Sequence, residues 1–70
     1  MSRWFVDVMR TDDGINWLID ATYTHVDHEA ALRQAYSFEL SPSRSVVISV
    51  QPFRLPTPVA GEIVDSAGTD

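Results

Sequence analysis

The sequence predicts an α+β fold in which a three-stranded antiparallel sheet, in the order 2-1-3, carries one helix on one face. Three observations predict this fold: alternation of apolar and polar residues in three segments, an aspartate–glycine pair between the first two, and helical spacing before the third. The expected order of elements is strand, strand, helix, strand. The sequence therefore indicates a small two-layer ββαβ domain, followed by a flexible C-terminal tail.

The first two predicted strands form a hairpin. Residues 3–10 alternate between the two faces of a strand and are rich in β-branched and aromatic side chains. Residues 15–24 alternate in the same way. Between them lies Asp13-Gly14, which favours a tight turn because type I′ turns need positive φ at both central residues. We therefore expect residues 3–10 and 15–24 to pair in an antiparallel ladder.

The turn also predicts which residues of the hairpin face each other. With the aspartate–glycine pair as the two turn residues, Val8 faces Ile19 on a mostly apolar face. On the opposite face, Asp7 faces Asp20. Like charges opposed across strands destabilise a sheet. A basic residue of a partner, or a bound cation, would convert that cost into binding energy.

A helix is expected after the hairpin. Asp27 is a good N-cap residue, and Thr24 with Asp27 is a competing capping box three residues earlier. Four apolar residues recur at spacings of three and four: Ala31, Leu32, Ala35 and Phe38. The helix must end by Ser41, because the residue before a proline is pushed out of the α region.

The third strand and the tail differ sharply in composition. Residues 44–53 alternate between two faces and form the third strand. Prolines and glycines then become frequent, so we expect residues 1–54 to form the ββαβ domain. Residues 55–70 are expected to form an acidic, weakly ordered tail. A short fourth strand within residues 59–64 is an alternative interpretation of this tail.

Charge and cysteine content exclude several function classes. Ten acidic residues against five basic ones give a net charge of −5, and all five basic residues are arginine. Direct binding to nucleic acid or to an anionic membrane is disfavoured, because both need a basic surface. The chain has no cysteine, which excludes thiol catalysis and stabilisation by disulfide bonds. We expect a protein of the cytoplasm, of a bacterium or of a host cell, without a membrane span or a signal peptide.

The sheet face that the helix leaves uncovered is the predicted functional surface. On this face, large apolar side chains surround the two opposed aspartates, and contiguous apolar patches with polar rims mark partner surfaces. We expect this bare face to bind a protein with a basic surface. The expected partner-binding residues are Phe5, Asp7, Met9, Leu18, Asp20 and Val47.

Catalysis and metal binding have weaker support in the sequence. Paired carboxylates suit acid–base chemistry, but Asp7 and Asp20 would lie on an open sheet without a cleft. His25 and His28 are weak candidates for metal ligands, with Asp20 as a third ligand, because a helix start already accounts for this segment. No catalytic residue, no cofactor and no metal site is therefore predicted, and the protein is not expected to be an enzyme.

The leading hypothesis is a non-enzymatic, acidic protein-binding module. A small acidic protein suits an inhibitor that blocks a nucleic-acid-binding protein by occupying its phosphate-binding groove. Phage-encoded inhibitors of host defence systems, anti-CRISPR proteins among them, share this size and charge, which is an analogy of class only. One alternative is a homodimeric accessory protein that pairs through the bare sheet face. Another is a small metal-binding domain that uses His25 and His28.

Overall fold

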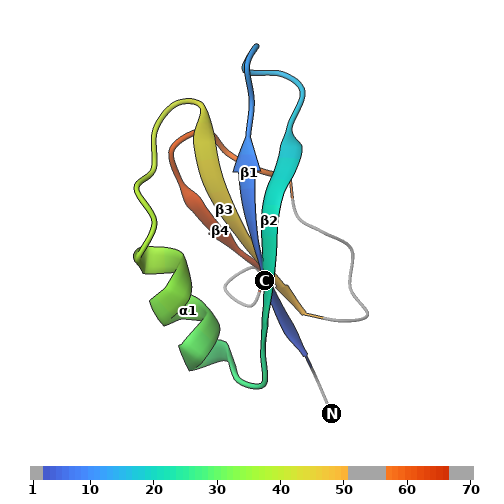
Figure 1. The fold of residues 1–70 in the computed structure, drawn as a ribbon, viewed down its shortest axis with the longest axis vertical. Coiled ribbons are helices and arrows are strands. Elements are labelled where there is room, and N and C mark those ends of the chain that lie inside the picture. The colour runs from blue at the N-terminus through green and yellow to red at the C-terminus, as the bar shows by residue number, and fades with distance from the viewer. Residues whose placement is uncertain (1–2, 51–56, 67–70) are drawn as a thin grey trace.

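The sheet has four strands and is mixed. The computed structural model describes residues 3–50 and 57–66. The elements follow one another as β1 (Trp4–Arg10), β2 (Leu18–His25), α1 (His28–Tyr36), β3 (Arg44–Val50) and β4 (Ile63–Asp65) (Figure 1). The sheet order is β2-β1-β3-β4, with β1 antiparallel to both neighbours and β4 parallel to β3. The α+β class is confirmed, but the prediction of a three-stranded, purely antiparallel sheet is wrong.

The fourth strand covers an edge that would otherwise be exposed. β4 pairs with β3 from Val46–Ile63 to Ile48–Asp65, and the Val46 N–H donates to the Glu62 carbonyl oxygen at 3.2 Å. Because β3 is the most apolar strand, leaving it at the edge would invite aggregation. The expectation of a weakly ordered tail is therefore wrong for the residues of β4, and the alternative of a short fourth strand within residues 59–64 is correct in part, because β4 begins at Ile63. β4 is only three residues long and lies among prolines and glycines, so alternation gave it little support. The predicted domain boundary at residue 54 and the end of the tail lie outside the described residues.

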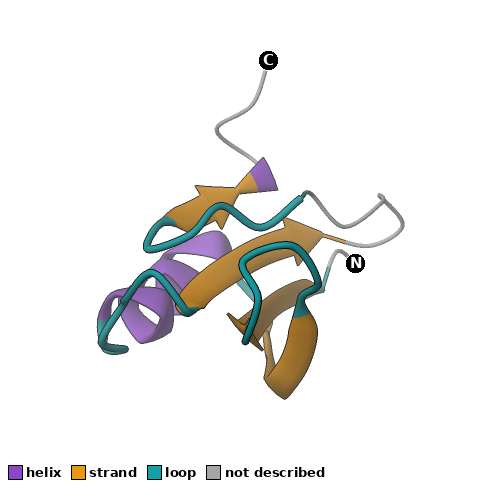
Figure 2. Ribbon diagram, turned by 90° about the horizontal axis from the view of Figure 1, so that it is seen from above, coloured by secondary structure: helices purple, strands orange, loops and turns teal. Residues whose placement is uncertain are grey.

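The helix begins where its N-cap predicts and ends before the expected limit at Ser41, so Phe38 lies beyond it. Asp27 is the N-cap, and its Oδ1 accepts a hydrogen bond from the Ala30 N–H at 2.7 Å. Ser37 is the C-cap. α1 lies against one face of the sheet (Figure 2). Within residues 3–50 and 57–66, no helix has the length and apolar character needed to cross a membrane.

The main core lies between α1 and the two central strands. Its fully buried members come from β1, α1 and β3: Val6, Ala31, Ala35, Val46 and Ile48. Partly buried side chains surround this cluster: Trp4, Leu32, Phe38, Leu40 and Ile63. β2 is an outer strand, and most of its side chains are exposed. The short helix therefore packs mainly over β1 and β3, which leaves β2 outside the core.

The hairpin register differs from the predicted one by two residues along most of its length. Val6 faces Tyr23 and Asp7 faces Thr22. A shift of two keeps each side chain on its face, so the assignment of Val6 and Val8 to the helix side holds. A bulge then interrupts the ladder at Asp20, between the Val8–Ala21 and Met9–Ile19 pairs. The observed register differs from the predicted one because the loop between β1 and β2 is longer than the expected two-residue turn.

Candidate interaction surface

The sheet face opposite α1 is not bare. Three of the predicted partner-binding residues are buried: Asp7, Met9 and Val47. Asp7 is only 4% exposed although it carries a carboxylate. Figures 1 and 2 show residues 57–62 reaching β4 from the side of the sheet opposite α1, passing behind β1 and β2 in Figure 1. The expectation of an uncovered face is therefore wrong. The structure gives no support to a homodimer that pairs through this face, because the face is not uncovered.

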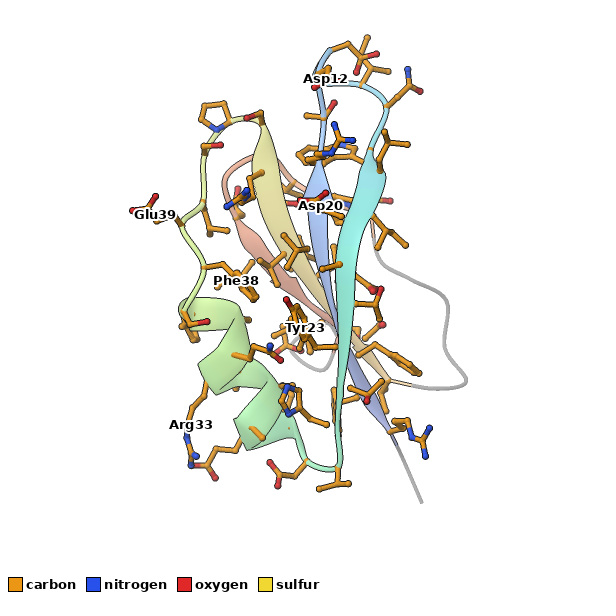
Figure 3. The ribbon with its side chains drawn as sticks, in the orientation of Figure 1. Asp12, Asp20, Tyr23, Arg33, Phe38 and Glu39 are labelled. Carbon is orange, nitrogen blue, oxygen red and sulfur yellow. The ribbon has the colours of Figure 1, made fainter. Side chains whose placement is uncertain are left out.

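The predicted surface residues that remain accessible lie on or near the outer strand. Leu18 and Asp20 are exposed on β2, and Phe5 is half-buried. Leu18 pairs with Arg10 and not with Met9, so its predicted place on the face away from α1 is wrong. Asp20 is visible on β2 in Figure 3, below the end of the hairpin. Of the six predicted partner-binding residues, these three are the ones that a partner could reach.

The two aspartates do not oppose each other. Asp7 Oδ1 accepts a hydrogen bond from the Thr22 hydroxyl at 2.7 Å. Asp20 lies at the bulge, and its Oδ1 is 3.4 Å from Arg10 Nε. The electrostatic cost expected from an opposed pair is thus absent, because each carboxylate has its own partner.

The two histidines bind separate partners within the fold. The His25 ring contacts the Gln34 side-chain oxygen, whereas His28 Nε2 lies 2.7 Å from Asp65 Oδ2. The His28 ring also packs on Trp4, with ring centroids 4.5 Å apart. These contacts connect the start of α1 to β1 and β4. Across residues 3–50 and 57–66, no group of three potential metal ligands lies together.

The loop between β1 and β2 is organised by one aspartate. We call residues 11–17 the acidic loop. Asp13 Oδ1 accepts hydrogen bonds from the Thr11 hydroxyl at 3.0 Å and from the N–H groups of Ile15 and Asn16, both at 2.8 Å. Asp13 Oδ2 accepts from the Asn16 side-chain amide at 2.8 Å. Gly14, at φ 79°, provides the left-handed residue that the loop requires.

Hydrogen bonding also controls the charge of this loop. The backbone N–H of Asn16, then that of Ile15, and then the Asn16 side chain hold the pKa of Asp13 far below its ordinary value of 3.8. Each of these donors stabilises the ionised carboxylate more than the neutral acid. Asp13 is therefore ionised throughout the physiological pH range.

The acidic loop exposes an apolar side chain between carboxylates. Ile15 is 78% exposed, and the Asp12 side chain is 88% exposed at the outer end of the hairpin (Figure 3). Leu18, just after the loop, is 54% exposed. Asp12 Oδ2 is 3.7 Å from Arg10 Nη1, which is a loose surface pair. The combination is a rigid, negatively charged projection with one large apolar group at its end.

The residues of this loop stand out in the sequence, but its conformation does not. Asp13-Gly14 predicts a two-residue turn, whereas the structure has a longer loop. Aspartate side chains also accept hydrogen bonds from backbone groups two or three residues further along the chain. The presence of Thr11 two residues before Asp13, and of Asn16 three residues after it, was the signal for this longer loop.

A shallow pocket of about 270 Å³ lies beside the acidic loop. Arg10 and Arg44 face each other across β1 and β3 at its floor. Its lining combines both charges with hydroxyl groups: Arg10, Thr11, Asp12, Glu39, Leu40, Ser41, Ser43 and Arg44. The acids in the lining offset the two arginines, so the pocket lacks the net positive charge that an anion site needs.

The role of Asp13 can be tested by its pH dependence. Because the pKa of Asp13 is lowered on folding, its stabilising contribution is complete above pH 3.8 and is lost as the pH falls below that value. Asp13→Asn keeps one acceptor oxygen but removes the titration. At neutral pH we expect the wild type to have a higher melting temperature than Asp13→Asn. This difference should shrink as the pH falls below 3.8. A constant difference in melting temperature from pH 7 down to about pH 2 would contradict this prediction.

Comparisons with known proteins give no further information about the site. No family model, no curated protein and no solved structure matches the chain.

Proposed function

We propose that the protein is a non-enzymatic, acidic binding module that docks on a basic protein surface through the acidic loop. The observation that carries this proposal is the hydrogen bonding of Asp13, which holds Ile15 and Asp12 outward in one geometry. A binding loop that is ordered before binding loses less conformational entropy when it docks. Its exposed isoleucine provides an apolar anchor, and the surrounding carboxylates provide charge complementarity.

The charge distribution supports a basic partner. The chain carries a net charge of −5, and Arg10 is already paired with Asp12 and Asp20. Acidic groups at the rim of an interface mainly accelerate association with a basic surface and exclude acidic competitors. Surfaces that contact nucleic-acid phosphates are strongly basic. We therefore infer that the module is an inhibitor that occupies the phosphate-binding groove of a nucleic-acid-binding protein.

The class of phage-encoded inhibitors of host defence, which includes anti-CRISPR proteins, fits this proposal by size and charge. The fold adds no weight to that analogy, because small α+β folds serve many unrelated functions. The exposed acidic loop supports docking there, and Leu18 and Asp20 are exposed on the strand that follows it.

Affinity capture tests the proposal. The immobilised chain is incubated with bacterial proteins that have been enriched on heparin, which selects for nucleic-acid-binding surfaces. We expect the wild type to retain one or more of these proteins and double-stranded DNA to displace them competitively. The Ile15→Asp variant should lose most of this binding without losing stability, because Ile15 is largely exposed.

A charge-matched pair of variants provides the control. Asp12→Lys reverses one carboxylate of the acidic loop, whereas Glu62→Lys reverses an exposed carboxylate just before β4. We expect the affinity to fall about tenfold or more for Asp12→Lys and to change little for Glu62→Lys. Equal retention by the wild type and by both loop variants, Ile15→Asp and Asp12→Lys, would contradict docking through the acidic loop.

A further inference from the structure

Within residues 3–50 and 57–66, the outer edge of β2 pairs with no other strand. β2 is eight residues long and pairs only with β1 among the described strands. Natural proteins guard such edges with lysine, proline, bulges or very short strands. The chain contains no lysine, and β2 contains no proline. Its one bulge lies at Asp20, so residues 21–25 form a regular edge that is in unbroken register with β1.

Exposed apolar side chains gather along this strand. Seven large hydrophobic residues are exposed in the described parts of the chain, and four of them lie between residues 18 and 26. These four are Leu18, Ile19, Tyr23 and Val26. The opposite edge of the sheet is β4, which is only three residues long. Of the four, only Tyr23 lies within the regular segment of residues 21–25. The two edges therefore differ mainly in length, and β2 is the longer edge available for further pairing.

The segment Ala21–His25 is complementary to itself. In an antiparallel pair centred on Tyr23, Thr22 faces Thr24 of a second copy, Tyr23 faces Tyr23, and Ala21 faces His25. Threonine pairs and aromatic pairs are among the favourable cross-strand combinations. Continuing one residue further places Asp20 opposite Val26. No two carboxylates oppose each other in this register.

We propose that the protein forms a symmetric homodimer in which the β2 strands of two copies pair antiparallel through residues 21–25. The product is a continuous eight-stranded sheet with a β4 strand at each outer edge. A two-fold axis perpendicular to the sheet would place both α1 helices on the same face. The short outer edges limit further growth, so the assembly closes at two copies instead of extending into a fibre.

Charge predicts how this dimer responds to salt. Each copy carries a net charge of −5, so the two copies repel each other at long range. Raising the ionic strength from about 0.05 M to about 0.5 M screens that repulsion. Dimerisation should therefore tighten as salt increases. The acidic loop is not part of the paired segment, and the dimer does not depend on the proposed function.

Directed cross-linking tests the register, because the natural chain has no cysteine. Chains carrying Thr22→Cys are mixed with chains carrying Thr24→Cys under mild oxidation. Directly opposed positions lie within disulfide reach, whereas two copies of residue 24 lie diagonally and further apart. We expect the mixture to cross-link at least about tenfold faster than Thr24→Cys alone. Equal rates would overturn the proposed register.

Sedimentation equilibrium tests the dimer itself. From about 1 µM to about 500 µM chain, we expect the mass to rise from 7.8 kDa toward twice that value. Thr24→Asp adds a carboxylate to the pairing edge and should stay monomeric. Ala60→Asp makes the same charge change outside the strands and should behave as the wild type. Circular dichroism verifies that both variants are folded. A wild-type mass of 7.8 kDa throughout the range, at low and high salt, would overturn the proposal.

Discussion

Replacing Ile48 by alanine is expected to remove about 3–4 kcal/mol from the free energy of unfolding. Ile48 lies on the central strand β3, is 0% exposed and packs in the cluster between the sheet and α1. Truncation loses the transfer free energy of the removed carbons and leaves a cavity that rigid neighbours cannot fill. A domain of this size has a total stability of roughly 3–10 kcal/mol. The variant should therefore be marginally folded at 25 °C.

Urea unfolding followed by tryptophan fluorescence measures this loss, because half-buried Trp4 packs against the same cluster. Ile48→Val removes one methylene group and should cost only about 1 kcal/mol. Ile15→Ala makes the same substitution at an exposed isoleucine and should stay within about 0.5 kcal/mol of the wild type. Similar losses for Ile48→Ala and Ile15→Ala would contradict the assigned core.

Asp7→Lys is expected to destabilise the protein by about 3 kcal/mol or more. Asp7 is buried on β1, and its carboxylate accepts a hydrogen bond from the Thr22 hydroxyl group at 2.7 Å. Lysine has no acceptor for that hydroxyl group, and it would place an unpaired ammonium group in a site that water hardly reaches. The direction of this effect is opposite to that expected if Asp7 lay on a bare face opposite Asp20.

Asp20→Lys is the matched control for Asp7→Lys. Asp20 is exposed, and its contact with Arg10 is a surface ion pair, so the same charge reversal should cost about 1 kcal/mol or less. Asp7→Asn keeps an acceptor oxygen for Thr22 and should also cost much less than Asp7→Lys. Equal unfolding midpoints in urea for Asp7→Lys and Asp20→Lys would show that Asp7 is not buried.

The elements with strong local signals were predictable from the sequence. Alternation located β1, β3 and most of β2, and Asp27 marked the start of α1 as its N-cap. These features depend on the periodicity and capping of neighbouring residues. β4 gave no comparable signal, because a strand of three residues is stabilised by pairing with β3 and not by its own pattern.

The candidate surface was less predictable because it depends on what covers each face. The sequence correctly placed Asp7, Met9 and Val47 on the side of the sheet away from α1. It could not show that these side chains are buried, since that depends on the path of residues far along the chain. Likewise, two-residue periodicity could not distinguish a register shifted by two, which preserves the faces of residues 21–25. It also could not predict the bulge at Asp20, which places Leu18 and Ile19 on the faces opposite to the predicted ones. The loop conformation that sets this register depends on Asp13 hydrogen bonds.

The most direct test of docking through the acidic loop is an NMR titration of the isotopically labelled chain with a DNA-binding protein that it retains. We expect the largest changes in amide chemical shift at residues 12–18, with smaller changes near Asp20. The amides of α1 and β4 should remain close to their free positions. Changes confined to α1 and β4, with an unperturbed acidic loop, would contradict the account.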